Sequence, residues 1–141
     1  MAQETPLRAL VLDEKGVWHI GSKNIKSFGG GCSVASVSAS DTDFGKLLGK
    51  IKAEIFKIDE NTNRIKTSIF HPMETGLIFG APEFYINKIE LSSNENILSS
   101  MELFSAISEN PRFIFEVKKR ASNYNIKFSD IDGNVFSSEI K

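Results

Sequence analysis

The sequence predicts an α+β fold, a single globular domain over residues 1–141 in which two helices pack on a mixed, mainly antiparallel sheet. Three observations lead to this prediction. Short apolar runs are bounded by turn residues, two segments carry helix-capping residues, and the expected strands cluster instead of alternating regularly with helices. At 141 residues the chain can bury one core, for which its eleven phenylalanines supply bulky side chains.

The amino-terminal third predicts three strands. The apolar runs 7–12 and 17–20 flank the turn sequence DEKG, which is the pattern of a hairpin. A polar loop with three glycines follows. The small and β-branched residues from Cys32 to Ser38 then predict a strand covered on both faces.

The first predicted helix begins near Ser40, a residue suited to an N-cap, with Asp43 three positions later. Its expected apolar stripe has the spacing i, i+3, i+4, i+7, i+11 and consists of Phe44, Leu47, Leu48, Ile51 and Ile55. Glycine or alanine recurs every fourth residue beside the stripe, at positions 45, 49 and 53. We expect this smooth strip to pack closely against the sheet.

Ser99 with Glu102 predicts a second, short helix that Pro111 must end. Between the two helices, apolar runs interrupted by glycine and proline predict irregular strands or hairpins. Beyond the second helix we expect three strands, over residues 112–119, 125–129 and 135–138. Asp132-Gly133 or Gly133-Asn134 supplies the tight turn of the last hairpin.

Composition excludes several classes of function. Seventeen basic against eighteen acidic residues give a net charge of -1, which offers no overall field for nucleic acid or an acidic membrane. We find no export signal and no apolar run long enough to span a bilayer, so we expect a cytoplasmic protein. One cysteine and two histidines cannot form an internal disulfide or a closed zinc site, and no cofactor is predicted.

Three local motifs invite chemical interpretations. The glycines at 29–31 precede a predicted strand, whereas a phosphate-binding loop must open directly into a helix, so we assign them to a loop. Cys32 would be a nucleophile only if His19 or His71 reached it as a base. The sequence DIDGN at 130–134 has its glycine too early for an EF-hand calcium loop and predicts a hairpin turn.

Between Leu10 and Ala53 the chain resembles the immunity proteins of bacterial contact-dependent growth inhibition systems, the CdiI family. The resemblance has three parts: a W-H-x-G strand, an I-x-S-F-G-x-G-C segment before a strand of small residues, and a D-x-x-x-G helix start. The matching residues are Trp18, His19 and Gly21; Ile25, Ser27, Phe28, Gly29, Gly31 and Cys32; and Asp41 and Gly45.

The resemblance implies a non-enzymatic cytoplasmic protein whose partner is the C-terminal domain of a cognate toxin, usually a nuclease, which it blocks by binding. Carboxylates beside aromatic anchors would suit the basic groove of such a toxin. The candidate toxin-binding residues are Asp59, Glu60, Glu83, Phe84, Tyr85, Asp130 and Asp132. Two alternatives stay open: a small thiol-dependent hydrolase using Cys32 with His19 or His71, and a general ligand-binding or protein-binding module.

Overall fold

A computed structural model of the chain describes residues 4–26, 43–77, 82–94, 96–118 and 123–140. They fall in two compact units, Met1–Gly31 and Cys32–Lys141. The prediction of one domain over 1–141 stays a prediction.

The first unit is a two-stranded antiparallel hairpin of β1 (Glu4–Leu12) and β2 (Trp18–Lys26). Asp13 shapes its turn, because the Oδ1 atom accepts hydrogen bonds of 2.9 Å from the backbone N–H groups of Lys15 and Val17. Gly16 closes the turn at φ +77°, a conformation that glycine adopts without strain. The hairpin and its turn are therefore confirmed.

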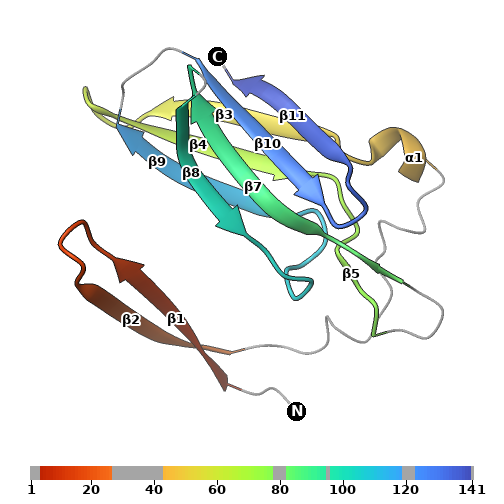
Figure 1. The fold of residues 1–141 in the computed structure, drawn as a ribbon, viewed down its shortest axis with the longest axis horizontal. Helices are drawn as coiled ribbons and strands as arrows, with labels where there is room; N and C mark the ends of the chain where they lie inside the picture. The colour runs from red at the N-terminus through yellow and green to blue at the C-terminus, as the bar shows by residue number, and fades with distance from the viewer. Residues whose placement is uncertain (1–3, 27–42, 78–81, 95, 119–122, 141) are drawn as a thin grey trace. The chain divides into compact units, whose positions relative to one another are not determined.

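The second unit contains two antiparallel sheets that face each other as layers (Figure 1). The three-stranded sheet has the order β3 (Ile51–Lys57), β4 (Thr62–Ile69), β9 (Arg112–Lys118). The four-stranded sheet has the order β11 (Val135–Ile140), β10 (Tyr124–Asp130), β7 (Ile86–Ser93), β8 (Asn96–Glu102). Two short strands, β5 (Glu74–Thr75) and β6 (Glu83–Phe84), pair beside them.

The core of this unit lies between the two sheets. Ile65, Ile69 and Phe115 project inward from the three-stranded sheet, and the four-stranded sheet contributes Ile86, Ile89, Leu91, Tyr124, Ile126, Phe128 and Ile140. Alternate residues of β4 and β10 are buried, with the patterns expected for strands that have one face in a core. Burial of these side chains is the main force that holds the layers together.

The prediction of an α+β fold with two helices is wrong. Strands make up most of the structure, and among the described residues the helical part is the four-residue α1 (Phe44–Leu47). A β-sandwich is the architecture that results when two such sheets pack face to face. The last two strands and their turn are confirmed, with Gly133 at φ +84° between β10 and β11.

Of the first predicted helix, only Phe44–Leu47 is helical among the described residues, and the helix ends just before Gly49. Gly49 has φ +76°, and the chain then enters β3. A Cβ atom at Gly49 would lie only 2.0 Å from a ring carbon of Phe136, so this glycine permits both a turn and a close approach. Ile51 and Ile55 are spaced i, i+4, which fits a helix face and equally one face of a strand. Pairing with β4 selects the strand.

The second predicted helix is also wrong, because Ser99 and Glu102 lie in β8 and pair with β7. The turn before β8 places Asn94 at φ +47°. Ser99, Met101 and Leu103 alternate toward the interior, a period of two that prevails over the capping pattern. The predicted strand over residues 32–38 and the N-cap at Ser40 lie outside the described residues.

Candidate functional site

A row of three residues crosses the outer face of the three-stranded sheet. Lys52 of β3 is the cross-strand partner of Ser68 in β4, and Ser68 is in turn the partner of Arg112 in β9. Their inward-facing neighbours, such as Ile69, are buried, whereas both cations are exposed. Since neighbouring strands lie about 4.8 Å apart, the two cationic side chains start about 10 Å from each other with a hydroxyl between them.

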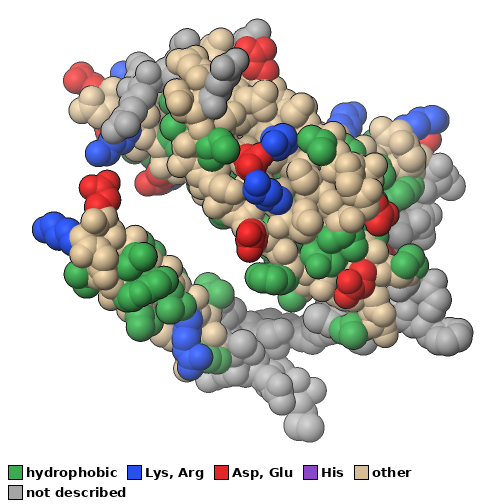
Figure 2. Space-filling model, in the orientation of Figure 1, with side chains coloured by type: hydrophobic (Ala, Val, Ile, Leu, Met, Phe, Trp, Pro, Cys, Tyr) green, Lys and Arg blue, Asp and Glu red, His purple; other side chains and the backbone are tan. Residues whose placement is uncertain are grey.

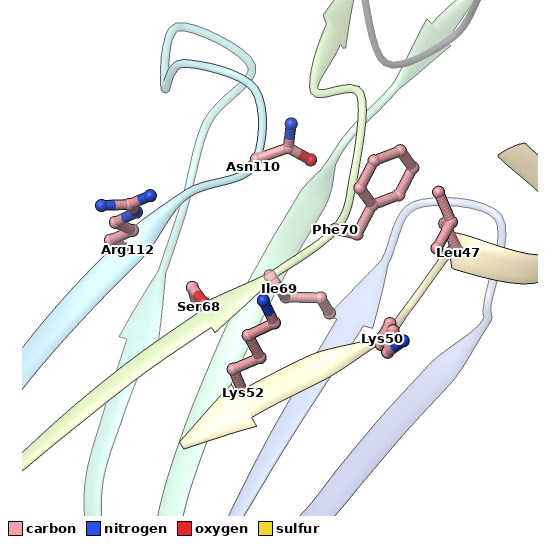
Figure 3. Close-up of a pocket in the computed structure, with 8 residues that line it drawn as sticks. All are labelled: Leu47, Lys50, Lys52, Ser68, Ile69, Phe70, Asn110 and Arg112. Atoms are coloured by element: carbon pink, nitrogen blue, oxygen red, sulfur yellow. The ribbon is translucent and has the colours of Figure 1, made fainter. Parts of the chain in front are cut away.

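This row forms one side of a cavity of about 260 Å³, which we call the basic pocket (Figure 3). Its lining residues are Leu47, Lys50, Lys52, Ser68, Ile69, Phe70, Asn110 and Arg112. Three of them are cations, two are neutral hydrogen-bonding side chains and three are apolar. None of these eight residues is acidic, so the pocket carries a concentrated positive charge on a protein whose net charge is -1.

Backbone hydrogen bonds fix the walls of the basic pocket. The N–H of Phe70 donates to the carbonyl of Lys50 at 3.0 Å, and the N–H of Gly49 donates to the carbonyl of Phe70 at 2.9 Å. On the other side, the N–H of Ile69 donates to the carbonyl of Pro111 at 3.3 Å. The segment before β3, the end of β4 with the residue after it, and the residue before β9 are therefore held together around the cavity.

Asn110 closes the pocket next to Arg112. Its N–H donates to the carbonyl of His71 at 2.9 Å, and its Oδ1 accepts from the N–H of His71 at 3.1 Å. The residue has φ +50°, a left-handed conformation that asparagine tolerates better than most residues. The paired bonds hold this side chain at a set position on the pocket wall.

Two other cations on the outer face of the same sheet, Arg64 and Lys66, have partners close by. The Arg64 Nη2 atom lies 2.5 Å from Glu116 Oε1, and the Lys66 ammonium lies 4.7 Å from the centroid of the Phe56 ring. Lys66 also faces Glu54 across the β3–β4 ladder. Only at the end of the face where Lys52, Ser68 and Arg112 lie does a row of the ladder combine two cations with no acid.

Five of the seven predicted toxin-binding residues lie at one end of the second unit, around His71. The Phe84 ring is 4.5 Å from the His71 ring, and the carbonyl of Tyr85, the residue after it, accepts a hydrogen bond of 3.1 Å from Ile131. Asp59 and Glu60 lie in the β3–β4 turn, at the opposite end of β4. An eight-residue strand spans about 26 Å, so the seven residues do not form one cluster.

Asp130 and Asp59 have structural roles in turns. Asp130 is buried and accepts hydrogen bonds from the backbone of Asp132 and from the backbone and side chain of Asn134, at 2.7–3.0 Å. Asp59 accepts a 2.7 Å bond from the N–H of Asn61, and this bond lowers the pKa of the Asp59 carboxyl. Asp132, Glu60 and Glu83 are exposed. Whether any of the seven residues contacts a protein stays a prediction.

His71 is fully buried and lies against Asp130. Its Nδ1 atom accepts a 3.2 Å hydrogen bond from the N–H of Met73, and its Nε2 atom lies 3.7 Å from Asp130 Oδ2, too far for a hydrogen bond. Burial lowers the pKa of His71, which the nearby carboxylates only partly oppose. The imidazole is therefore neutral at physiological pH and has the character of a structural residue.

The described residues give little support for a catalytic pair of the Cys32 thiol with His19 or His71 as its base. His19 is exposed on the hairpin, where its Nε2 atom lies 3.0 Å from Asp13 Oδ2. His71 is enclosed in the second unit. Cys32 lies outside the described residues. In the described part of the chain, no group of three or more metal-ligating side chains comes together, and no helix there is long and apolar enough to cross a membrane.

The hairpin carries an apolar surface that its own two strands cannot cover. Leu10 pairs with Ile20 and Leu12 pairs with Trp18, which places all four side chains on the same face. Their exposed fractions run from 52% for Leu12 to 69% for Ile20. We call these four residues the hairpin face. Sequence reasoning found the strands but missed this face, although the alternation in LVL and WHI indicates it.

Comparison with known proteins gives one family. The profile of a family described as "Sulphur oxidation protein SoxZ" matches residues 53–141, more than half of the chain. No curated protein matches the sequence. Among solved structures, the crystal structure of hypothetical protein PH1083 from Pyrococcus horikoshii OT3 aligns with a TM-score of 0.44 at 14% identity, covering 63% of this chain and 82% of that one.

Proposed function

Because the chain belongs to the SoxZ family of sulphur oxidation proteins, we propose that it is a non-catalytic component of a sulphur oxidation system that works by binding a partner protein, SoxY. The observation that carries the proposal is the hairpin face. A component without its own chemistry acts through a binding surface, and an exposed cluster of large apolar side chains is the usual mark of one.

The family assignment corrects the resemblance to CdiI immunity proteins. The motifs behind that resemblance lie between Leu10 and Ala53, whereas the SoxZ profile begins at residue 53. The residues that carry the CdiI resemblance therefore lie almost entirely outside the region that matches the SoxZ family. Toxin neutralisation and a toxin partner are wrong, and nothing favours the hydrolase alternative.

Physical considerations favour a protein partner on the hairpin face. A two-stranded hairpin is marginally stable alone in water, so a surface that covers one face stabilises it. Burying a leucine-sized side chain is worth about 1.5–3 kcal/mol, and tryptophan is the commonest anchor of protein interfaces. The face offers one tryptophan, two leucines and an isoleucine in two cross-strand pairs.

The cellular compartment of the protein is part of the same proposal. The sequence leads us to expect the cytoplasm, whereas SoxZ proteins are typically periplasmic. We favour the periplasm because it follows from the family. Cell fractionation with the native protein distinguishes the two compartments.

The test uses two leucines of the same strand. Leu10 lies on the hairpin face, and Leu7 is equally exposed, at 62% against 59%, but points to the opposite face. We expect Leu10→Ser to weaken binding of SoxY by about tenfold or more in calorimetry, while Leu7→Ser has little effect.

Two outcomes contradict the proposal. One is wild-type affinity in both variants. The other is a loss of thermal stability in Leu10→Ser without SoxY that accounts for the whole effect, because the hairpin face would then pack on the chain itself. The double variant Leu10→Ser with Trp18→Ser repeats the test at both pairs of the face.

A second candidate function is favoured by one observation: this chain of a sulphur oxidation family has a single cysteine, Cys32, after the glycines at 29–31. A thiolate that attacks the S–S bond of a polysulfide keeps the attacked sulphur as a persulfide and releases the remaining, shortened polysulfide as the leaving group. Cys32 lies outside the described residues, so the support is the sequence and the family. A mass gain on Cys32 after treatment with polysulfide, absent in Cys32→Ser, is the expected result.

A further inference from the structure

We infer that the basic pocket binds a small tetrahedral oxyanion, and that the ligand is a sulphur oxyanion or sulphonate group. The first part rests on the geometry of the pocket. The identity of the central atom as sulphur rests on the proposed function.

The charge and the donor types of the basic pocket fit an oxyanion. Lys52 and Arg112 approach from the two outer strands, and the Ser68 hydroxyl lies between them in the same row of the ladder. Guanidinium and ammonium groups donate several hydrogen bonds but accept none, so both present only donors to a ligand. Lys50 adds a third cation to the lining, and none of the residues that line the pocket is acidic.

The size of the pocket selects a small ligand. Pockets for drug-sized molecules have volumes of about 300–1,000 Å³, and the basic pocket, at about 260 Å³, falls below them. The cavity holds a four-oxygen or three-oxygen anion together with some of its water.

The apolar wall makes a sulphur oxyanion a better ligand than phosphate. Leu47 and Phe70 line the pocket beside the cations, and Figure 3 shows them together with Lys50 and Lys52 around the same space. Thiosulphate and a sulphonate each carry an oxyanion at one end and a weakly hydrated atom, sulphur or carbon, at the other. Such a ligand matches a pocket that has charge on one wall and apolar side chains on another.

Backbone hydrogen bonds hold the walls of the basic pocket in position. The bonds from Phe70 to Lys50, from Ile69 to Pro111 and between Asn110 and His71 fix the backbone around the cavity. Little ordering remains to oppose binding apart from the lysine and arginine side chains.

The test titrates the full chain with the sodium salts of thiosulphate, sulphate, methanesulphonate, phosphate and chloride at low ionic strength, followed by amide NMR and calorimetry. We expect thiosulphate to saturate one site and to shift the amide signals of residues 68–70 and 110–112. Arg112→Gln should weaken thiosulphate binding about tenfold or more, which is the size of one hydrogen bond to a charged group.

The matched control is Lys66→Gln. Lys66 lies on β4 two residues from Ser68 and on the same outer face, but over the Phe56 ring instead of in the basic pocket. Its loss should change thiosulphate affinity by less than about twofold, through screening alone. If Arg112→Gln does not fold, Lys52→Gln removes the other cation of the row.

The outcomes separate the possible sources of the ligand. Binding of thiosulphate but not methanesulphonate supports a free ion, and equal binding of both supports a sulphonate group carried on a larger molecule. The inference is overturned if Lys66→Gln weakens binding as much as Arg112→Gln does, or if chloride competes equally at equal ionic strength. Preference for phosphate over thiosulphate, sulphate and methanesulphonate overturns the sulphur assignment.

The same variants keep this inference apart from the proposed function. Arg112→Gln should retain SoxY affinity, and Leu10→Ser should retain thiosulphate affinity. A protein that binds SoxY without binding thiosulphate contradicts only the pocket, and the reverse result contradicts only the hairpin face.

Discussion

Asn110 holds the backbone of His71 by two hydrogen bonds, one from its N–H to the His71 carbonyl at 2.9 Å and one to its side-chain Oδ1 from the His71 N–H at 3.1 Å. This contact joins the loop before β9 to the loop after β4. It connects the wall of the basic pocket to the buried imidazole, which lies on the other side of the same loop.

Replacement of Asn110 should destabilise the protein through two separable effects. Asn110→Ala leaves the His71 N–H without its acceptor and forces alanine into φ +50°. We expect a loss of about 2–4 kcal/mol in the free energy of unfolding, measured with urea. Asn110→Gly removes the side chain without the backbone strain and should recover about 1–2 kcal/mol of it. Equal losses in both variants would show that strain is absent.

Gly49 should tolerate alanine worse than Gly133 does. Both have positive φ, but a Cβ atom at Gly49 meets the Phe136 ring at 2.0 Å, whereas a Cβ atom at Gly133 meets nothing within 4 Å. Gly133→Ala therefore costs about 1–2 kcal/mol from conformation alone, and Gly49→Ala adds about 1–3 kcal/mol of overpacking. Thermal unfolding of the two variants compares the costs. An equal fall in Tm would contradict the close contact.

Stability should decline as the pH falls below 6.5 because of His71. Burial lowers its pKa in the folded protein, while Asp130 and Asp132 act in the opposite direction. As the pH falls through 6.5, His71 therefore becomes protonated in the unfolded chain but stays neutral in the folded chain. The contribution of neutral His71 to the free energy of unfolding is complete above pH 6.5 and is lost on acidification. The expected slope reaches about 1.4 kcal/mol per pH unit. His71→Gln should flatten the profile of unfolding free energy between pH 5 and 6.5.

Glu90 should support stability at moderately acidic pH. Its carboxylate lies 2.6 Å from the Lys88 ammonium and also contacts Lys127, and these partners lower its pKa from 4.5 to about 2. The contribution is present above pH 4.5 and is lost as the pH falls toward 2. Glu90→Gln should remove this part of the acid dependence, and an NMR titration of the Glu90 carboxyl checks the pKa. A midpoint near 4.5 would contradict the role of the two lysines.

Predictions from sequence held where the structure depends on neighbours along the chain. The DEKG turn and the turn after Asp130 contain asparagine, aspartate and glycine at positions where their own backbone preferences decide the conformation. The predictions from sequence failed where the same residues satisfy both the helix period and the strand period. Ile51 and Ile55 satisfy a helix stripe and a strand face together, and Ser99 to Glu102 imitates a capping box inside an edge strand.

The candidate site could not be read from the sequence for a similar reason. Lys52, Ser68 and Arg112 are far apart along the chain, and only the register of β3, β4 and β9 sets them side by side. The sequence did contain a signal for the hairpin face, because Leu10, Leu12, Trp18 and Ile20 alternate with smaller or polar residues. We predicted functional carboxylates instead, and Asp130 proved to be a buried turn residue.

By itself, the sequence determined the two local hairpins and the region that shows the SoxZ family. The tertiary structure decided that residues 51–57 and 96–102 are strands, and it placed two cations and a hydroxyl in one row. The physical reason is that turns are governed by the dihedral preferences of a few adjacent residues. Sheets are governed by pairing and burial between segments whose contacts no local pattern records.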